Sequence, residues 1–198
     1  MFFMNMQFSA LSVAFEIRQT RNERHLSVVP FMALLTNSAV WSAYGWFKGE
    51  LPVLLPNLAG TVSGLTCVLL YHRFSMFVIP LQHIAISMTV VLGALYCIYG
   101  LGDIEAVGYL GCFLAIFMFA SPLVTLGRVI RERSTRSMPF YTSFSGWLNS
   151  LSWSLYGLLV AHDFMVYGPN LAGFALSSFQ LLLYVVYGFD SREEDKVR

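Results

Sequence analysis

Charged side chains are scarce in this chain of 198 residues, at 12% of the total, where a soluble domain usually carries about 25%. Hydrophobic residues make up 57% of it. A water-soluble fold of this size could not bury so much apolar surface, so the composition excludes a soluble globular protein and indicates one embedded in lipid. The net charge is +1 and no dense run of Lys and Arg occurs, which excludes a nucleic-acid partner.

Cysteine is also rare, and its spacing excludes most site chemistry. The three cysteines, Cys67, Cys97 and Cys112, lie in apolar stretches, with no C-x-x-C pair and no Cys/His spacing of metal type. The His, Asp and Ser residues form no nucleophile arrangement. The sequence therefore predicts no metal, no cofactor and no catalytic residue, and it predicts that the cysteines serve as small hydrophobes within helices.

Long apolar runs are what the sequence has in abundance. A helix needs about 20 apolar residues to cross the hydrocarbon core. Residues 1–16 are interpreted as a short spanning helix, since they lack the basic segment and small-residue cleavage site of a signal peptide. Short connections force neighbouring spans to run antiparallel. Seven spans are predicted, at 1–16, 27–47, 51–71, 76–99, 104–126, 138–160 and 164–187.

The positive charges fall on one side of this seven-span arrangement. Eleven of the twelve Lys and Arg residues lie in alternate loops on that side, and only Lys48 lies on the other. By the positive-inside rule, the N-terminus is expected outside or in a lumen and the C-terminus in the cytosol. We expect a multi-pass protein of the plasma membrane, with an endomembrane as the alternative and a homo-oligomer left open.

Two sequence blocks occur twice, in the same order. NSAVWSAYG at 37–45 reappears as NSLSWSLYG at 149–157, and PNLAG at 56–60 reappears at 169–173. A repeat of three helices ends on the opposite membrane face, so a second copy in the same orientation needs one extra crossing. The sequence predicts an all-α membrane protein with seven transmembrane helices, arranged 3+1+3. Two parallel triple-helix repeats (1–74 and 101–189) are joined by a linker helix (75–100) and followed by a cytosolic tail (190–198).

The repeated polar and aromatic residues are candidates for a binding site. Asn57 and Asn170 each follow a proline within a span, where an unpaired amide is costly. Each could instead bond a neighbouring helix carbonyl as a structural link, and Trp41 and Trp153 could be interfacial residues. The matched positions favour convergence on the pseudo-twofold axis. Amides match the hydroxyls of a neutral polyol, and indole faces stack on sugar rings.

The sequence favours passive transport. Acidic residues lie near span ends, whereas an ion-coupled pump buries an acidic residue or a His chain; His83, in the linker helix, is interpreted as contacting a neighbour. Moving parts are expected at the helix breakers Pro30, Pro122 and Pro139. Pro30 and Pro139 lie near helix starts, where proline is often merely tolerated.

Two sets of residues resemble the SWEET sugar transporters over nearly the whole chain. The second half carries SPL at 121–123, RVIRERST at 128–135, MPF at 138–140, WSLYG at 153–157 and PN at 169–170. The first half carries VPF at 29–31 with Asn37, Trp41, Tyr44-Gly45 and Asn57. Transporters of this family are known to contain parallel repeats.

The resemblance implies bidirectional sugar uniport by alternating access. It implies that sugar binds between Asn57 and Asn170 with Trp153, and that Trp41 occupies the facing position. It implies an inner hinge of four prolines, of which Pro30, Pro122 and Pro139 are present and Ala10 replaces the fourth. Outer-gate positions correspond to Tyr44, Tyr156 and Asp163.

The substrate is expected to be a mono- or disaccharide, and two Trp residues should narrow the pocket toward a monosaccharide such as glucose. The alternatives are a seven-helix receptor or an amino-acid exporter of the wider Pro-Gln-loop group. Against the receptor, no Pro-Gln dipeptide occurs at these prolines, since Pro30 and Pro139 are followed by Phe. Against the exporter, no counter-charge for a zwitterion is evident deep in the membrane.

Overall fold

The computed structural model describes residues 27–75 and 79–189, and this part of the chain is helical throughout, without strands. The predicted first span (1–16), with Ala10, and the tail (190–198) lie outside the described residues. The helices are α2 (Val29–Lys48), α3 (Leu51–Phe74), α4 (Leu81–Tyr99), α5 (Ile104–Met118), α6 (Ala120–Glu132), α7 (Phe140–Leu159) and α8 (Phe164–Tyr187).

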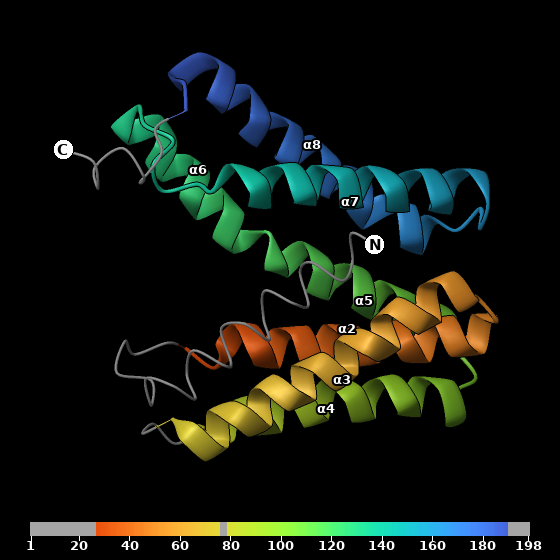
Figure 1. The fold of residues 1–198 in the computed structure, drawn as a ribbon. Coiled ribbons are helices and arrows are strands. Elements are labelled where there is room, and N and C mark those ends of the chain that lie inside the picture. Colours follow the sequence, from red (N-terminus) through yellow and green to blue (C-terminus); the bar gives the residue numbers. More distant parts are fainter. Residues whose placement is uncertain (1–26, 76–78, 190–198) are drawn as a thin grey trace. The chain divides into compact units, whose positions relative to one another are not determined.

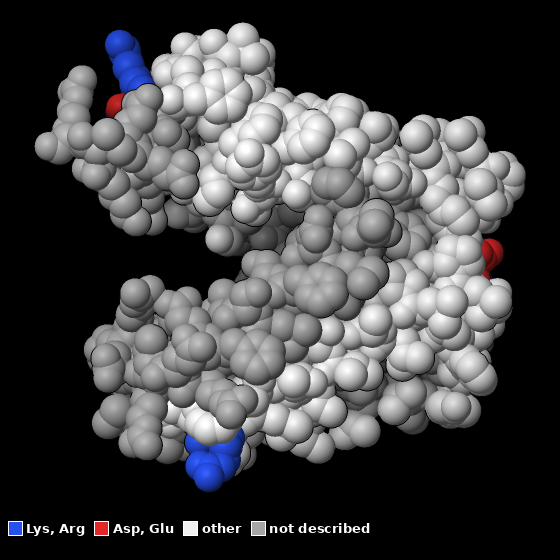
Figure 2. All heavy atoms as spheres, in the orientation of Figure 1, with Lys and Arg blue, Asp and Glu red and all other residues white. Residues whose placement is uncertain are grey.

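Membrane-spanning character is plain in four of these segments, namely α3, α4, α5 with α6, and α8, by length and composition. Helices α2 and α7 have 20 residues each, enough to cover about 30 Å at about 1.5 Å per residue. They carry more Ser, Thr and Asn, because they contain the repeated block. Among the described residues on the face seen in Figure 2, charged side chains occupy only small areas.

Two helix boundaries differ from the predicted spans by five residues or more, and the others differ by at most three. α4 begins at Leu81, later than the predicted residue 76, because Pro80 caps it in an extended conformation (φ −61°, ψ 130°). α6 continues to Glu132 instead of ending at 126. The reason is that arginines in its last turns have long aliphatic stems that carry their charge outward without ending the helix.

A break divides the fifth predicted span. Pro122 has no N–H, so the Met118 carbonyl four residues earlier loses its helical partner. α5 ends at Met118, and α6 begins at Ala120 after the single turn residue Phe119. The Phe119 nitrogen donates to the Ile116 carbonyl at 3.0 Å. This bond spans three residues, as in a 3₁₀-helix, instead of the four of an α-helix.

The chain forms two compact units, Met1–Gly111 and Cys112–Arg198, each described here by itself. In the first unit α2 packs against α3 and α4 (Figure 1). In the second unit α7 packs along α8, which also contacts α6. The predicted division into two repeats and a linker helix remains a prediction.

The two helix hairpins close with similar turns, in which the closing hydrogen bond spans five residues in the first and six in the second. The nitrogens of Glu50 and Asp163 each bond the carbonyl of the preceding repeated glycine, Gly45 or Gly157, at 2.9 Å. The residue before each acid is left-handed, with φ 73° at Gly49 and φ 49° at His162. The repeated sequence therefore builds two related hairpins, the second one residue longer, with His162 at its left-handed position.

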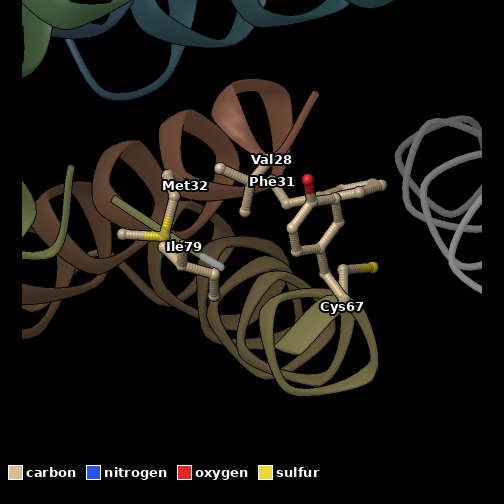
Figure 3. Packing of buried hydrophobic residues seen from close by; sticks show 6 residues of the cluster. Val28, Phe31, Met32, Cys67 and Ile79 are labelled. Atoms are coloured by element: carbon tan, nitrogen blue, oxygen red, sulfur yellow. The ribbon is translucent and has the colours of Figure 1, made fainter. Parts of the chain in front are cut away.

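Each unit has an apolar cluster near a hinge candidate. In the first unit Val28, Phe31 and Met32 of the α2 region pack with Cys67, Tyr71 and Ile79 (Figure 3). In the second unit the cluster comprises Leu126, Val129, Met138, Leu183 and Tyr184. The clusters hold the segments around Pro30 and Pro139 against the third helix of each predicted repeat.

Candidate functional site

The first unit places Trp41 and Tyr44 together on α2. Their spacing of three puts both on one helix face, and the rings meet edge to face with centroids 5.5 Å apart and planes at 81°. Both side chains are buried. The Lys48 ammonium lies 5.7 Å from the centre of the Tyr44 ring, a cation–π distance. The indole of Trp41 is thus braced by a residue predicted at the outer gate.

The second unit repeats this pair on α7. Trp153 and Tyr156 meet edge to face with centroids 5.7 Å apart and planes at 89°. Trp153 is partly buried, whereas Trp41 is buried. The same indole–phenol geometry is therefore built at matched positions of both units.

The two asparagines are also held alike. The Asn57 amide nitrogen donates to the Val53 carbonyl at 2.8 Å, and the Asn170 amide nitrogen donates to the Val166 carbonyl at 2.7 Å. Each acceptor lies one turn earlier on the same helix, so these bonds are not the links to a neighbouring helix that were weighed as an alternative. Each bond uses one amide hydrogen, and an amide also has a second N–H and a carbonyl oxygen for a ligand.

Sequence reasoning missed one contact beside Asn170. Pro169 lacks an N–H and so leaves the Met165 carbonyl without its helical donor. The Cys112 thiol of α5 donates to that carbonyl at 3.3 Å. Cys112 was predicted to be only a small hydrophobe. The sole sequence signal was the proline, which identifies the acceptor but not the donor.

Asp163, predicted at the outer gate, is the N-cap of α8. Its carboxylate accepts a hydrogen bond from the Met165 nitrogen at 2.9 Å. At the matching position in the first unit, Glu50 is the N-cap of α3 but makes no side-chain capping bond. Asp163 therefore fixes the start of the helix that carries Asn170, and its gating role remains a prediction.

The three hinge candidates all lie at irregular helix ends. Pro30 lies in the first turn of α2, Pro139 is the N-cap of α7 with φ −67° and ψ 124°, and Pro122 is the third residue of α6, after the Phe119 break. Mere tolerance at a helix start thus remains an alternative for Pro30 and Pro139.

The candidate sugar-binding residues are shared equally between the units, Trp41 and Asn57 in the first and Trp153 and Asn170 in the second. In each unit the Trp ring contacts the Tyr ring, and the Asn amide is hydrogen-bonded within its own helix. The convergence of all four on one sugar remains a prediction.

The family model described as "Sugar efflux transporter for intercellular exchange" matches residues 1–77 and 105–192. The chain belongs to the SWEET family of sugar transporters. It is 28% identical to Sugar transporter SWEET1 of Rattus norvegicus, over 100% of this chain and 91% of that protein. It is 31% identical to Bidirectional sugar transporter SWEET16 of Oryza sativa subsp. japonica, over 86% of this chain, and it spans 55% of that longer protein.

A solved structure of a eukaryotic SWEET transporter resembles this chain, with a TM-score of 0.82 and 31% sequence identity over 94% of this chain and 91% of the other. The predicted family and the all-α membrane fold class are thereby confirmed. The chain is a multi-pass membrane protein that transports sugar, and SWEET proteins are transporters, not enzymes.

Proposed function

We propose that this SWEET protein carries a monosaccharide such as glucose down its gradient in either direction, by alternating access, with the sugar held between the two repeats. The observation that carries this proposal is the duplicated geometry. At matched positions, each unit has a Trp and a Tyr ring in edge-to-face contact. Each unit also has an Asn amide hydrogen-bonded to the carbonyl one turn earlier on its own helix. A ligand with hydroxyls around a flat apolar ring face suits amides at its rim and indoles against its faces.

The absence of charge at depth supports a passive mechanism. Among the described helices, Asp, Glu, Lys and Arg occur only within the first two or last five residues of a membrane-crossing segment. Proton coupling would normally place an ionisable pair deeper. Glucose uptake into vesicles should therefore be unchanged when a protonophore collapses the proton gradient, and a loss of uptake would contradict uniport.

The central test is radiolabelled glucose flux into vesicles containing the purified chain. Asn170→Ala should abolish flux without changing the amount of protein in the membrane. Leu171→Ala is the matched control, since Leu171 is the next residue on α8 and is 44% exposed. Flux that survives in Asn170→Ala would contradict the central site. Amino-acid flux in place of sugar flux would instead support an exporter, and no flux of either would support a receptor.

Substrate size gives an independent test. Two indoles should leave room for one sugar ring, so radiolabelled sucrose should cross far more slowly than glucose. Equal rates for the two sugars would contradict the monosaccharide preference while leaving uniport intact.

The charge distribution supports a cytosolic C-terminus and an N-terminus outside or in a lumen, and the plasma membrane is the location proposed. A C-terminal tag should be reached by antibody only after the plasma membrane of cells is permeabilised. Staining of intact cells would reverse the orientation, and an intracellular pattern would support an endomembrane instead. Chemical crosslinking in the same cells would reveal any homo-oligomer.

A further inference from the structure

The turn between α6 and α7 is fastened to the end of α8 by two hydrogen bonds, one buried and one part-buried. The Tyr184 hydroxyl donates to the carbonyl of Met138. The Thr135 hydroxyl donates to the carbonyl of Gly188 at 2.8 Å. Thr135, Met138 and Tyr184 are 2%, 4% and 5% exposed. The Tyr184 bond is buried, whereas the Thr135 bond is part-buried because its acceptor, Gly188, is exposed. We call these two bonds the Tyr184 latch.

The latch surrounds the hinge candidate Pro139. The carbonyl just before the proline accepts from Tyr184, and the ring just after it, Phe140, meets the Tyr184 ring edge to face at 5.2 Å and 90°. Phe189 closes the group, with ring centroids 5.1 Å from Phe140 and 5.3 Å from Tyr184. A rotation of the backbone at Pro139 would change the position of Met138 relative to Phe140, so Tyr184 could not keep both contacts.

The first unit has only part of this arrangement. Tyr71, the repeat equivalent of Tyr184, is also buried, at 4% exposure. It contacts Phe31, which follows Pro30, with centroids 6.4 Å apart and planes at 58°. Across the described residues, no hydrogen bond joins the Tyr71 hydroxyl to the backbone beside Pro30. The aromatic contact is thus repeated, whereas among the described residues a tyrosine–backbone bond beside the proline occurs in the second unit only.

We propose that Tyr184 is a positioning residue for transport, which holds the Pro139 turn against α8 in one access state and releases it when the turn swings. The inference rests on the proposed alternating access. A buried carbonyl that loses its donor in an apolar setting is costly, so the latch favours the state in which it is closed. In the second repeat, this hydrogen bond therefore holds the turn before Pro139 against α8.

The first experiment locks the latch. The native cysteines are first replaced, with serine at position 112. Phe140→Cys and Phe189→Cys are then introduced together, and a short bifunctional crosslinker that thiols can cleave joins the two new cysteines. The bridged protein should lose at least tenfold in glucose exchange and regain it when the bridge is reduced. Undiminished exchange in the bridged protein would overturn the latch. Absence of glucose exchange before bridging would count against the proposed function. In that case the second experiment alone tests whether the latch holds the turn.

The second experiment needs no flux. A Met138→Cys side chain keeps the backbone acceptor and should react slowly with a sulfonated maleimide, in membrane fragments open on both faces. Tyr184→Phe should speed its labelling about fivefold, the change expected for one hydrogen bond. Thr135→Val should act in the same direction, and Thr135→Ser should restore slow labelling.

Two controls separate the latch from a general loss of stability. Tyr71→Phe, the same change in the first unit, should leave labelling of Met138→Cys unchanged. Ser154→Cys, buried on α7 at 4% exposure, should label no faster when Tyr184→Phe is added. Equal acceleration at both cysteines, or none at Met138→Cys, would overturn the proposal.

Discussion

Gly157 of α7 and Tyr167 of α8 approach so closely that a Cβ atom on Gly157 would lie 2.7 Å from the Tyr167 backbone nitrogen. Gly45 and Leu54 hold the same relation in the first unit, at 2.8 Å. Since the obstructing atoms belong to the backbone, no side-chain rotation can relieve the clash. Glycine at both repeat positions thus sets how tightly each hairpin closes.

Gly157→Ala should destabilise the protein by about 1–3 kcal/mol, the usual cost of overpacking, because α7 and α8 must separate. Thermal unfolding of the purified protein in detergent measures this. Gly146→Ala is the control on the same helix, where the nearest atom would lie at an ordinary 3.5 Å. Equal midpoints for the two variants would contradict the close packing.

Gly111→Ala should reduce glucose flux by about tenfold, equivalent to about 1.4 kcal/mol. Its Cβ would lie 2.9 Å from Cε2 of Trp41 and would displace the indole proposed to face the sugar. Flux per molecule in the membrane is the measurement. Gly93→Ala on α4, with nothing within 4 Å, should transport normally; unchanged flux in Gly111→Ala would argue against a role for the Trp41 position.

Cys112→Ala should lower stability by about 1 kcal/mol, since the Met165 carbonyl freed by Pro169 would lose its donor. Cys112→Ser should retain most of that stability, because a hydroxyl can donate in place of the thiol. Unfolding midpoints of the two variants, with Cys97→Ala as a neutral control, test this. Identical midpoints for Ala and Ser at position 112 would show that the hydrogen bond contributes nothing.

His162→Gly should raise stability, because His162 adopts φ 49° where the first hairpin uses Gly49. A left-handed residue with a Cβ costs about 1–2 kcal/mol, partly offset by the flexibility of glycine in the unfolded chain. His162→Ala keeps the strain and so isolates the backbone effect. The glycine variant should unfold at the higher temperature, and the reverse order would refute the strain.

Features that depend on local spacing could be predicted from the sequence. Trp41 with Tyr44 and Trp153 with Tyr156 share a helix face because they are three residues apart, and the repeat places them at matched positions. Pro122 likewise predicts a weakened helix, and the Phe119 break lies where its missing N–H would have bonded.

Contacts between distant segments could not be predicted. Cys112 and Met165 are 53 residues apart, and Tyr184 and Met138 are 46 apart. No periodicity links such pairs, because which helix faces lie opposite is decided by packing. The end of α6 also differs from the predicted span, because an apolar run stops at the first charged residues, whereas the arginines of α6 keep their backbone helical to Glu132.

The hydrogen bonds that orient Asn57 and Asn170 lie within single helices, and this has a consequence for any carrier that works from two sides. A rigid movement of α3 or α8 cannot break a bond to its own preceding turn, so each amide keeps its rotamer while its surroundings change. At the sugar site proposed above, the amides would be ordered before sugar binds, which would avoid an entropy loss of about 0.5–1.5 kcal/mol for each side chain that binding otherwise immobilises. In the proposed uniport, sugar arriving from either side would meet amides held in the same way.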